Sequence, residues 1–358
     1  MRSWLLISLS LTVGLTILAG RASAAAPDAV GSLPFTRLKF GSVALYSEND
    51  KYFAGTDRNY TNGFKLSFLS TDLKSLSADP VPKTIQQLAR TFSRVLPAGR
   101  EYKLGLALGQ NIYTPTDTEL TTYQPNDRPY AAWGYVSAAF HVFSPPPPSA
   151  IGGLAQGQLD TLEVSIGVVG PGALGRQVQN NIHHLIGVET AKGWAQQIHN
   201  EPGLQVGYER KLRLATPEAE LGWGADLIPH AGVTLGNVFT YLNAGAEVRL
   251  GWRLPGDFGT HLIRPSGDSN PRRRPAFSLF GFAASDSRLV ARDLTLQGNS
   301  FRASPSIGAK HFVSDVHGGL AVATRHWQFT YSQAARSREF VGQEKRSVFG
   351  SFSATFYY

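Results

Sequence analysis

Residues 47–63, which read SENDKYFAGTDRNYTNG, gather carboxylates, amides and hydroxyls in one short segment. The segment joins two runs, 40–48 and 61–70, whose alternation of apolar and polar residues predicts strands. Asn49 and Asp50 favour tight turns because their side chains bond to nearby backbone groups. The same side chains carry oxygen atoms that a functional site could use. The residue types therefore leave two interpretations open, an Asx-rich turn and a chemical site.

The connection 170–202 carries a second candidate, a predicted helix with a histidine. Its apolar positions, which recur at helical spacing, are Val178, Ile182, Leu185 and Ile186. Gly187 is expected to end this helix. Gln179 and His183 are four residues apart, so they share one face of this helix. Histidine has a pKa suited to a base near neutral pH, although a single helical histidine is more often only a polar residue.

Alternating residues predict the elements that must hold these segments. In YLNAGAEVRLGWRL, residues 241–254, one face is apolar and the other carries Glu247 and Arg249. A soluble sandwich, the alternative fold, would rarely bury such charges, whereas a barrel with a polar lumen and a lipid-facing exterior accommodates both faces. The run 348–358 also alternates and ends on the aromatic Tyr358, as terminal strands of outer-membrane proteins do. We predict an all-β fold, a transmembrane antiparallel up-and-down β-barrel of about 12 strands.

The strand positions also predict which connections share an end of the barrel. Strands are predicted at 40–48, 61–70, 102–112, 131–143, 159–169, 203–214, 224–235, 241–254, 275–287, 304–313, 319–332 and 346–358. With both termini in the periplasm, connections after odd-numbered strands face outward. Segments 47–63 and 170–202 then meet at the outer rim. The amphipathic helix predicted within 170–202 therefore belongs to an extracellular loop. The helix-like run within 71–101 and the solvated arginines 272–274 fall at the periplasmic end.

The ends and composition of the chain predict export. Residues 1–24 have a basic start, a short apolar run and a small-residue end, which is typical of a cleaved signal peptide, and leave 25–358 as one barrel domain. Removal of Arg2 and Arg21 leaves 32 basic residues against 26 acidic ones, a formal charge of about +6. The chain has no cysteine, so no disulfide framework supports it. Nothing in the sequence predicts a nucleic-acid partner.

Five short segments, taken in order, carry a resemblance to a known family: END at 48–50, DRNYTNG at 57–63, QNIYTP at 110–115, GVVGP at 167–171 and VQNNIHHLIG at 178–187. Together they resemble the LpxR-type lipid A 3′-O-deacylases of Gram-negative outer membranes. TLQG at 295–298 is also similar to a family segment. The resemblance spans nearly the whole mature chain, and the ordered set is more specific than any one piece.

The resemblance implies a twelve-stranded outer-membrane barrel that removes the 3′-acyloxyacyl group of lipid A, with lipopolysaccharide of the outer leaflet as its partner. It implies a histidine that activates water and a Ca²⁺ ion that polarises the ester, similar to phospholipase A2. Position by position, His183 matches the histidine and Thr61 a hydroxyl at the start of the second strand. Asn49 and Asp50 match an Asn-Asp pair whose oxygen atoms are ligands of the kind Ca²⁺ prefers.

Two further residues are assigned from their positions near His183. Glu189 looks like a carboxylate that orients the imidazole or stabilises its charged form, and Gln179 is a candidate for substrate binding. The adjacent His184 is a second candidate base, but the match on both sides selects His183. His183, Glu189 and Gln179 thus complete the expected site with Asn49, Asp50 and Thr61.

Two alternatives to this function stay open. One is another outer-membrane lipid or phospholipid esterase that uses a serine activated by histidine, although no GxSxG-like motif occurs. The other is a non-enzymatic barrel of the same fold, for which the matched set of polar residues would have no purpose.

Overall fold

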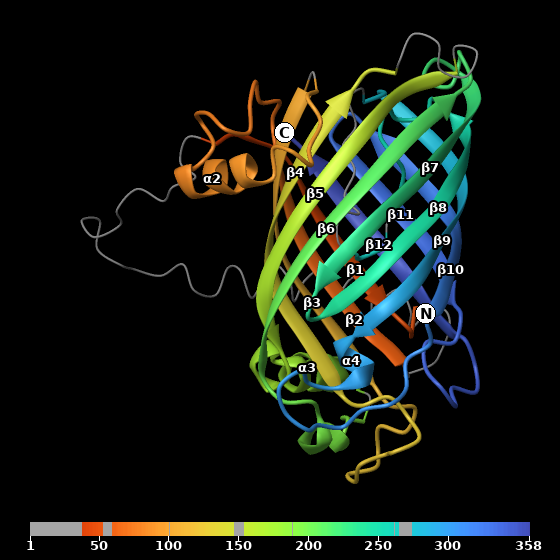
Figure 1. Ribbon diagram of the computed structural model, residues 1–358. Helices are drawn as coiled ribbons and strands as arrows, with labels where there is room; N and C mark the ends of the chain where they lie inside the picture. Colours follow the sequence, from red (N-terminus) through yellow and green to blue (C-terminus); the bar gives the residue numbers. More distant parts are fainter. Residues whose placement is uncertain are drawn as a thin grey trace, which may run out of the picture.

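Residues 38–52, 59–99, 101–146, 154–187, 189–260, 262–264 and 274–358 are those that the structure, a computed structural model, describes. Within them, twelve antiparallel strands close into one barrel in sequence order, and β1 pairs with β12 (Figure 1). The strands are β1 (Phe40–Asn49), β2 (Asn59–Ser70), β3 (Glu101–Thr114), β4 (Ala131–Ser144), β5 (Ala155–Val169), β6 (Glu201–Ala215), β7 (Trp223–Gly236), β8 (Phe239–Trp252), β9 (Phe277–Asp293), β10 (Phe312–Thr324), β11 (Trp327–Arg336) and β12 (Ser347–Tyr357). The predicted all-β barrel is confirmed, while the predicted signal peptide lies outside the described residues.

Strand β8 shows why alternation forms this barrel. Leu242, Val248 and Leu250 are each more than half exposed on its outer face, where lipid would surround them. Arg249, which is fully buried, points into the lumen and pairs with Asp226 of β7. Charged side chains of neighbouring strands thus neutralise one another inside, and apolar side chains form the outer surface.

We expect Val136→Arg to destabilise the barrel by about 2–4 kcal/mol, because it places a charge near the middle of a lipid-facing strand. Val136 lies in β4 and is 51% exposed on the outer face. Denaturant unfolding in lipid vesicles measures the change, and Val136→Leu serves as the control that keeps the face apolar. Equal stability of the two variants would contradict the assignment of this face to lipid.

The two ends of the barrel carry different helices. Figure 1 shows α2 (Lys83–Thr91) at one end and both α3 (Gly175–Ile186) and α4 (Leu294–Gln297) at the other. The end with α3 also holds the end of β1 and the start of β2, as the strand parity predicts. The helix predicted within 71–101 is α2, which packs with its flanking loops against Leu104, Phe140 and Leu162 on the barrel wall. No helix of the described residues is both long and apolar enough to span a membrane.

Two predicted strands were wrong in position. The predictions 304–313 and 319–332 correspond to a hairpin of β10 and β11, with the turn at Arg325 and His326. Thr324 stabilises this turn, because the Trp327 backbone N–H donates to its hydroxyl oxygen at 3.0 Å. The apolar residues on both sides of Arg325 therefore belong to two strands, and the arginine that interrupts the pattern is the turn itself.

The connection after β8 enters the lumen. β8 ends at Trp252, two residues earlier than predicted, and Arg253 adopts a left-handed φ of 52°. We call residues 254–260 and 262–264 the inward-folded segment. Its contacts advance along the barrel: Asp257 bonds Arg249, the Thr260 N–H donates to Glu247, and the Ile263 N–H donates to Glu48. Arg272 and Arg273, predicted as a solvated loop with Arg274, lie outside the described residues, and the Arg274 guanidinium lies over the Tyr357 ring.

Candidate functional site

The first three strands form the wall that carries the candidate residues. In the β1 and β2 pairing, Asn49 lies opposite Asn62. The β2 and β3 register shifts between Tyr60 and Asn62, which makes Thr61 the extra residue of a β-bulge. The hydroxyls of Thr61 and Thr114 share a hydrogen bond of 2.7 Å. The bulge therefore joins Thr61 to the end of β3, at the same level as the end of β1.

Side-chain contacts assign the two faces of this wall. Tyr60 contacts Tyr113 and accepts a hydrogen bond from the Asn111 amide at 2.9 Å, on the lumen side. Ile112, between those two β3 residues, points the other way and packs in a cluster with Trp194. Because strand residues alternate, Thr114 shares the outer face with Ile112, and the bulged Thr61 bonds it there. The candidate hydroxyl thus lies on the outside of the barrel.

Helix α3 packs on that same outer face. Val178 of α3 belongs to the cluster of Ile112, Ala132 and Trp194, which covers β3 and β4. Trp194 lies in the short helix η3 (Gly193–Gln196), and its indole N–H donates to the side-chain oxygen Oε1 of Gln179 at 2.8 Å. Because an indole N–H can only donate, the side-chain oxygen of Gln179 must face Trp194. The side-chain NH₂ of Gln179 therefore points away from Trp194. This NH₂ is buried and has no hydrogen-bond partner among the described residues.

The turn before α3 depends on the segment GVVGP. Gly170 adopts a φ of 95°, and a Cβ at this position would lie 2.5 Å from the His199 carbonyl oxygen. Its N–H donates to the Ala132 carbonyl at 2.9 Å, and η2 (Pro171–Ala173) follows. The side-chain NH₂ of Gln110, on the outer face of β3, then donates to the backbone carbonyl of Ala173. The glycine therefore lets the chain fold back onto the wall and start α3 there.

His183 is held by the loop that follows α3. Its Nδ1 lies 2.6 Å from the Glu189 backbone carbonyl, and since a carbonyl only accepts, Nδ1 carries the proton. Nε2 of the neutral ring then keeps its lone pair. The Glu189 carboxylate, expected from the sequence to orient the ring, is 73% exposed and pairs with Lys192 at 3.7 Å. Glu189 therefore contacts His183 through its backbone.

Asn49 and Asp50 end β1 in a turn. The Lys51 N–H donates to the Asn49 side-chain oxygen at 2.8 Å, which is an Asx turn. Asp50 and Thr61 are each 2% exposed and His183 is 3% exposed, so the expected site is largely shielded from water. The structure thus shows the turn that the residue types suggest, with a buried carboxylate directly after it.

The oxygen atoms around this turn are of the chemical type that binds a hard cation such as Ca²⁺. Asp50 offers a carboxylate and Asn49 an amide oxygen, and Ca²⁺ in proteins takes such groups together with backbone carbonyls and water. In the part of the chain that the structure describes, no three acidic, histidine or cysteine side chains are grouped to hold a metal ion. A site with one carboxylate, an amide and carbonyls does not require such a group.

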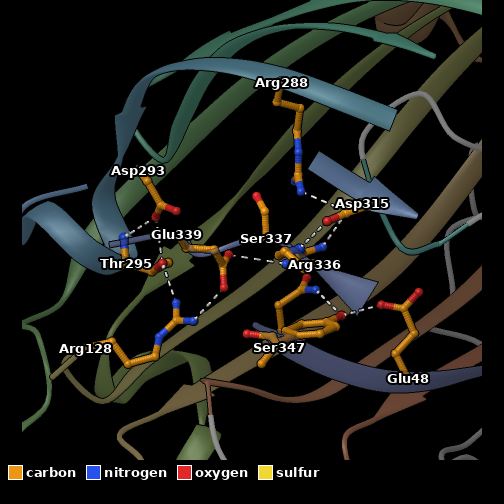
Figure 2. Close-up of polar contacts among 12 residues, drawn as sticks. Glu48, Arg128, Arg288, Asp293, Thr295, Asp315, Arg336, Ser337, Glu339 and Ser347 are labelled. Carbon is orange, nitrogen blue, oxygen red and sulfur yellow. Dashed lines mark hydrogen bonds and ion pairs between the residues drawn. The ribbon is translucent and has the colours of Figure 1, made fainter. Parts of the chain in front are cut away.

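A charged network crosses the lumen behind this wall. Figure 2 shows Arg336 of β11 between Asp315 and Glu339, and Arg128 reaching Glu339 and Thr295. The Arg336 guanidinium also lies over the Tyr60 ring at 5.5 Å. These contacts join the loops at the α3 end of the barrel to β2. The network therefore braces the inner side of the wall whose outer side holds Thr61.

Several residues of this region were not assigned by the sequence. Glu48 is 1% exposed and accepts hydrogen bonds from the Tyr60 hydroxyl at 2.7 Å and the Ile263 N–H at 2.6 Å. Trp194 anchors Gln179. Glu48 could have been found from alternation, because a glutamate on the lumen face of a strand needs a partner there. Trp194 gives no signal in the sequence, since its contact with α3 depends on the loop path.

Comparison with known proteins supports the fold and the family. A family model described as "Outer membrane protein LpxR" matches residues 5–358. The solved structure of LpxR from Salmonella typhimurium is similar with a TM-score of 0.67 and 22% identity, covering 88% of this chain and 100% of that one. The β domain of the Bordetella autotransporter BrkA is more distant, with a TM-score of 0.41, 8% identity and coverage of 89% and 100%. Among curated proteins, no sequence matches the chain.

Proposed function

Because this chain belongs to the LpxR family of outer membrane proteins, we propose that it is an outer-membrane carboxylic ester hydrolase that removes the 3′-acyloxyacyl group of lipid A. The observation that carries the proposal is His183, a buried histidine with its Nδ1 proton bound to a carbonyl, on a helix packed against the outer wall. The substrate is lipid A of lipopolysaccharide in the outer leaflet. That lipid surrounds the outer wall, so its ester reaches the site without entering the lumen.

His183 acts as the general base. Its Nε2 takes the proton of a water molecule, and the water oxygen attacks the ester carbonyl carbon. The bond between that carbon and the 3′ oxygen of the sugar then breaks, and the imidazolium returns the proton to the departing sugar oxygen, which releases the acyl group as a carboxylic acid. The Glu189 carbonyl keeps the proton on Nδ1 and stabilises the imidazolium that forms, because this hydrogen bond strengthens when the ring is charged. Glu189 therefore belongs to the proposed site as a positioning residue that acts through its backbone.

The developing negative charge of the ester oxygen needs a partner. Asn49 and Asp50 would hold Ca²⁺, which supplies Lewis-acid stabilisation of such charge when bound. Thr61 lies next to Asn62, which is opposite Asn49, and the hydroxyl bond to Thr114 fixes its position beside this turn. The Gln179 NH₂, whose other end is fixed by Trp194, donates to the substrate from the face of α3 that also carries His183.

Mass spectrometry of hexa-acylated lipid A after incubation with the folded mature chain and Ca²⁺ tests this function. We expect loss of the 3′-acyloxyacyl group as one unit. Release of fatty acids from phospholipids with intact lipid A would instead support another outer-membrane esterase. If the folded barrel released neither product, the proposal would be wrong and a non-enzymatic barrel would remain.

A further inference from the structure

We infer that Glu48 is a positioning residue, which holds the candidate site in register from the lumen side of the wall. Glu48 directly precedes Asn49 and Asp50, and Tyr60 directly precedes Thr61. The Tyr60 hydroxyl donates to Glu48 Oε2 at 2.7 Å, so one hydrogen bond ties the end of β1 to the start of β2. This inference rests on the proposed site but concerns residues to which the resemblance gives no role.

The strand pairing gives this bond its geometry. Glu48 lies opposite Gly63, and a Cβ on Gly63 would be 1.9 Å from the Tyr60 hydroxyl oxygen. Glycine therefore leaves the space through which the tyrosine side chain reaches back to Glu48. The register shift at Thr61 brings Tyr60 to the same face as Gly63, and Thr61 remains on the outer face with its bond to Thr114. The inner bond and the outer bond thus stabilise the same bulge.

The second oxygen of Glu48 is held by the inward-folded segment, which enters the lumen from the opposite end of the barrel. The Ile263 N–H of the inward-folded segment donates to Glu48 Oε1 at 2.6 Å, and the Ser351 hydroxyl lies 3.4 Å from the same oxygen. The following residue, Arg264, pairs with Glu209 of β6 and with Asp286 of β9. The segment is therefore fixed to distant strands when it reaches Glu48, and it acts as a rigid brace.

The tyrosine is fixed from its other side as well. The Arg336 guanidinium lies over its ring, and Figure 2 shows that Asp315 and Glu339 hold this arginine. The Asn111 amide donates to the Tyr60 hydroxyl oxygen, which orients the hydroxyl proton toward Glu48. The segment that meets Glu48 and the arginine that meets Tyr60 are thus themselves anchored, which is the condition for accurate placement of a neighbouring site.

Two variants and one matched control test this role. Glu48→Gln replaces one acceptor oxygen with an NH₂ group, and Tyr60→Phe removes the donor while keeping the ring. Glu247→Gln is the control, because Glu247 also accepts from the inward-folded segment, at the Thr260 N–H and hydroxyl, but lies on β8. Hydrogen exchange of the amides at 49–52 and 59–63 reports the geometry, and the Ca²⁺ concentration for half-maximal deacylation reports its effect on the site.

We expect Glu48→Gln and Tyr60→Phe to speed exchange at 49–52 and 59–63 and to raise the half-maximal Ca²⁺ concentration about tenfold, with kcat at saturating Ca²⁺ retained. Glu247→Gln should lower thermal stability and leave both readouts at the wild-type values. Wild-type exchange and Ca²⁺ response in Glu48→Gln would overturn the inference. If wild type itself showed no deacylation, the proposed function would fail, and the exchange data alone would still decide whether Glu48 positions this turn.

Discussion

His183→Ala is expected to lower the rate of lipid A 3′-deacylation by about 10²–10⁴-fold, the usual contribution of a general base. The imidazole is buried, and its Nδ1 donates to the Glu189 carbonyl, so only Nε2 remains to take a proton from water. No neighbouring group replaces it, because adjacent helical residues point in different directions and His184 is exposed. Mass spectrometry of the lipid A product measures the rate.

The matched control for this variant is His184→Ala. It removes the same side chain one position further along α3, and we expect close to wild-type activity. Heat-modifiable migration of the barrel on gels should show that both variants are folded. Full activity of folded His183→Ala, or a comparable loss in His184→Ala, would assign the base to a different residue.

Asp50→Asn is expected to lower deacylation about 100-fold at a fixed Ca²⁺ concentration, and chelation of Ca²⁺ should do the same to wild type. The substitution keeps the shape of the side chain and removes its negative charge, which a hard cation requires most. Asp50 is 2% exposed at the end of β1, so solvent cannot replace the lost ligand easily. Deacylation assayed over a Ca²⁺ titration separates weaker metal binding from a slower chemical step.

Asp117→Asn controls for the general loss of one negative charge at the α3 end of the barrel. Asp117 is exposed in the connection between β3 and β4, where its carboxylate accepts from the Glu119 N–H. We expect its Ca²⁺ response to match wild type. Chelator-resistant activity of the wild-type chain, or an unchanged Ca²⁺ response in Asp50→Asn, would remove the metal from the proposed mechanism.

The sequence alone determined the class of fold and the end of the barrel at which the candidate residues lie. Alternation is a local property of a strand, so Arg249 among apolar neighbours already indicated a polar lumen. Strand parity placed Asn49, Thr61 and His183 at one rim without any knowledge of contacts. Alternation could not locate β10 and β11, because a tight turn at Arg325 and His326 interrupts a pattern that otherwise continues through both strands.

Only the tertiary structure decided how these residues are held. The Glu189 backbone, and not its carboxylate, meets His183, because the loop after α3 bends back along a path that residue spacing does not specify. The bond from Ile263 to Glu48 joins residues that are 215 positions apart. Such contacts depend on which side chains fill the lumen and on how loops cross it, and these are properties of the closed barrel that no single strand encodes.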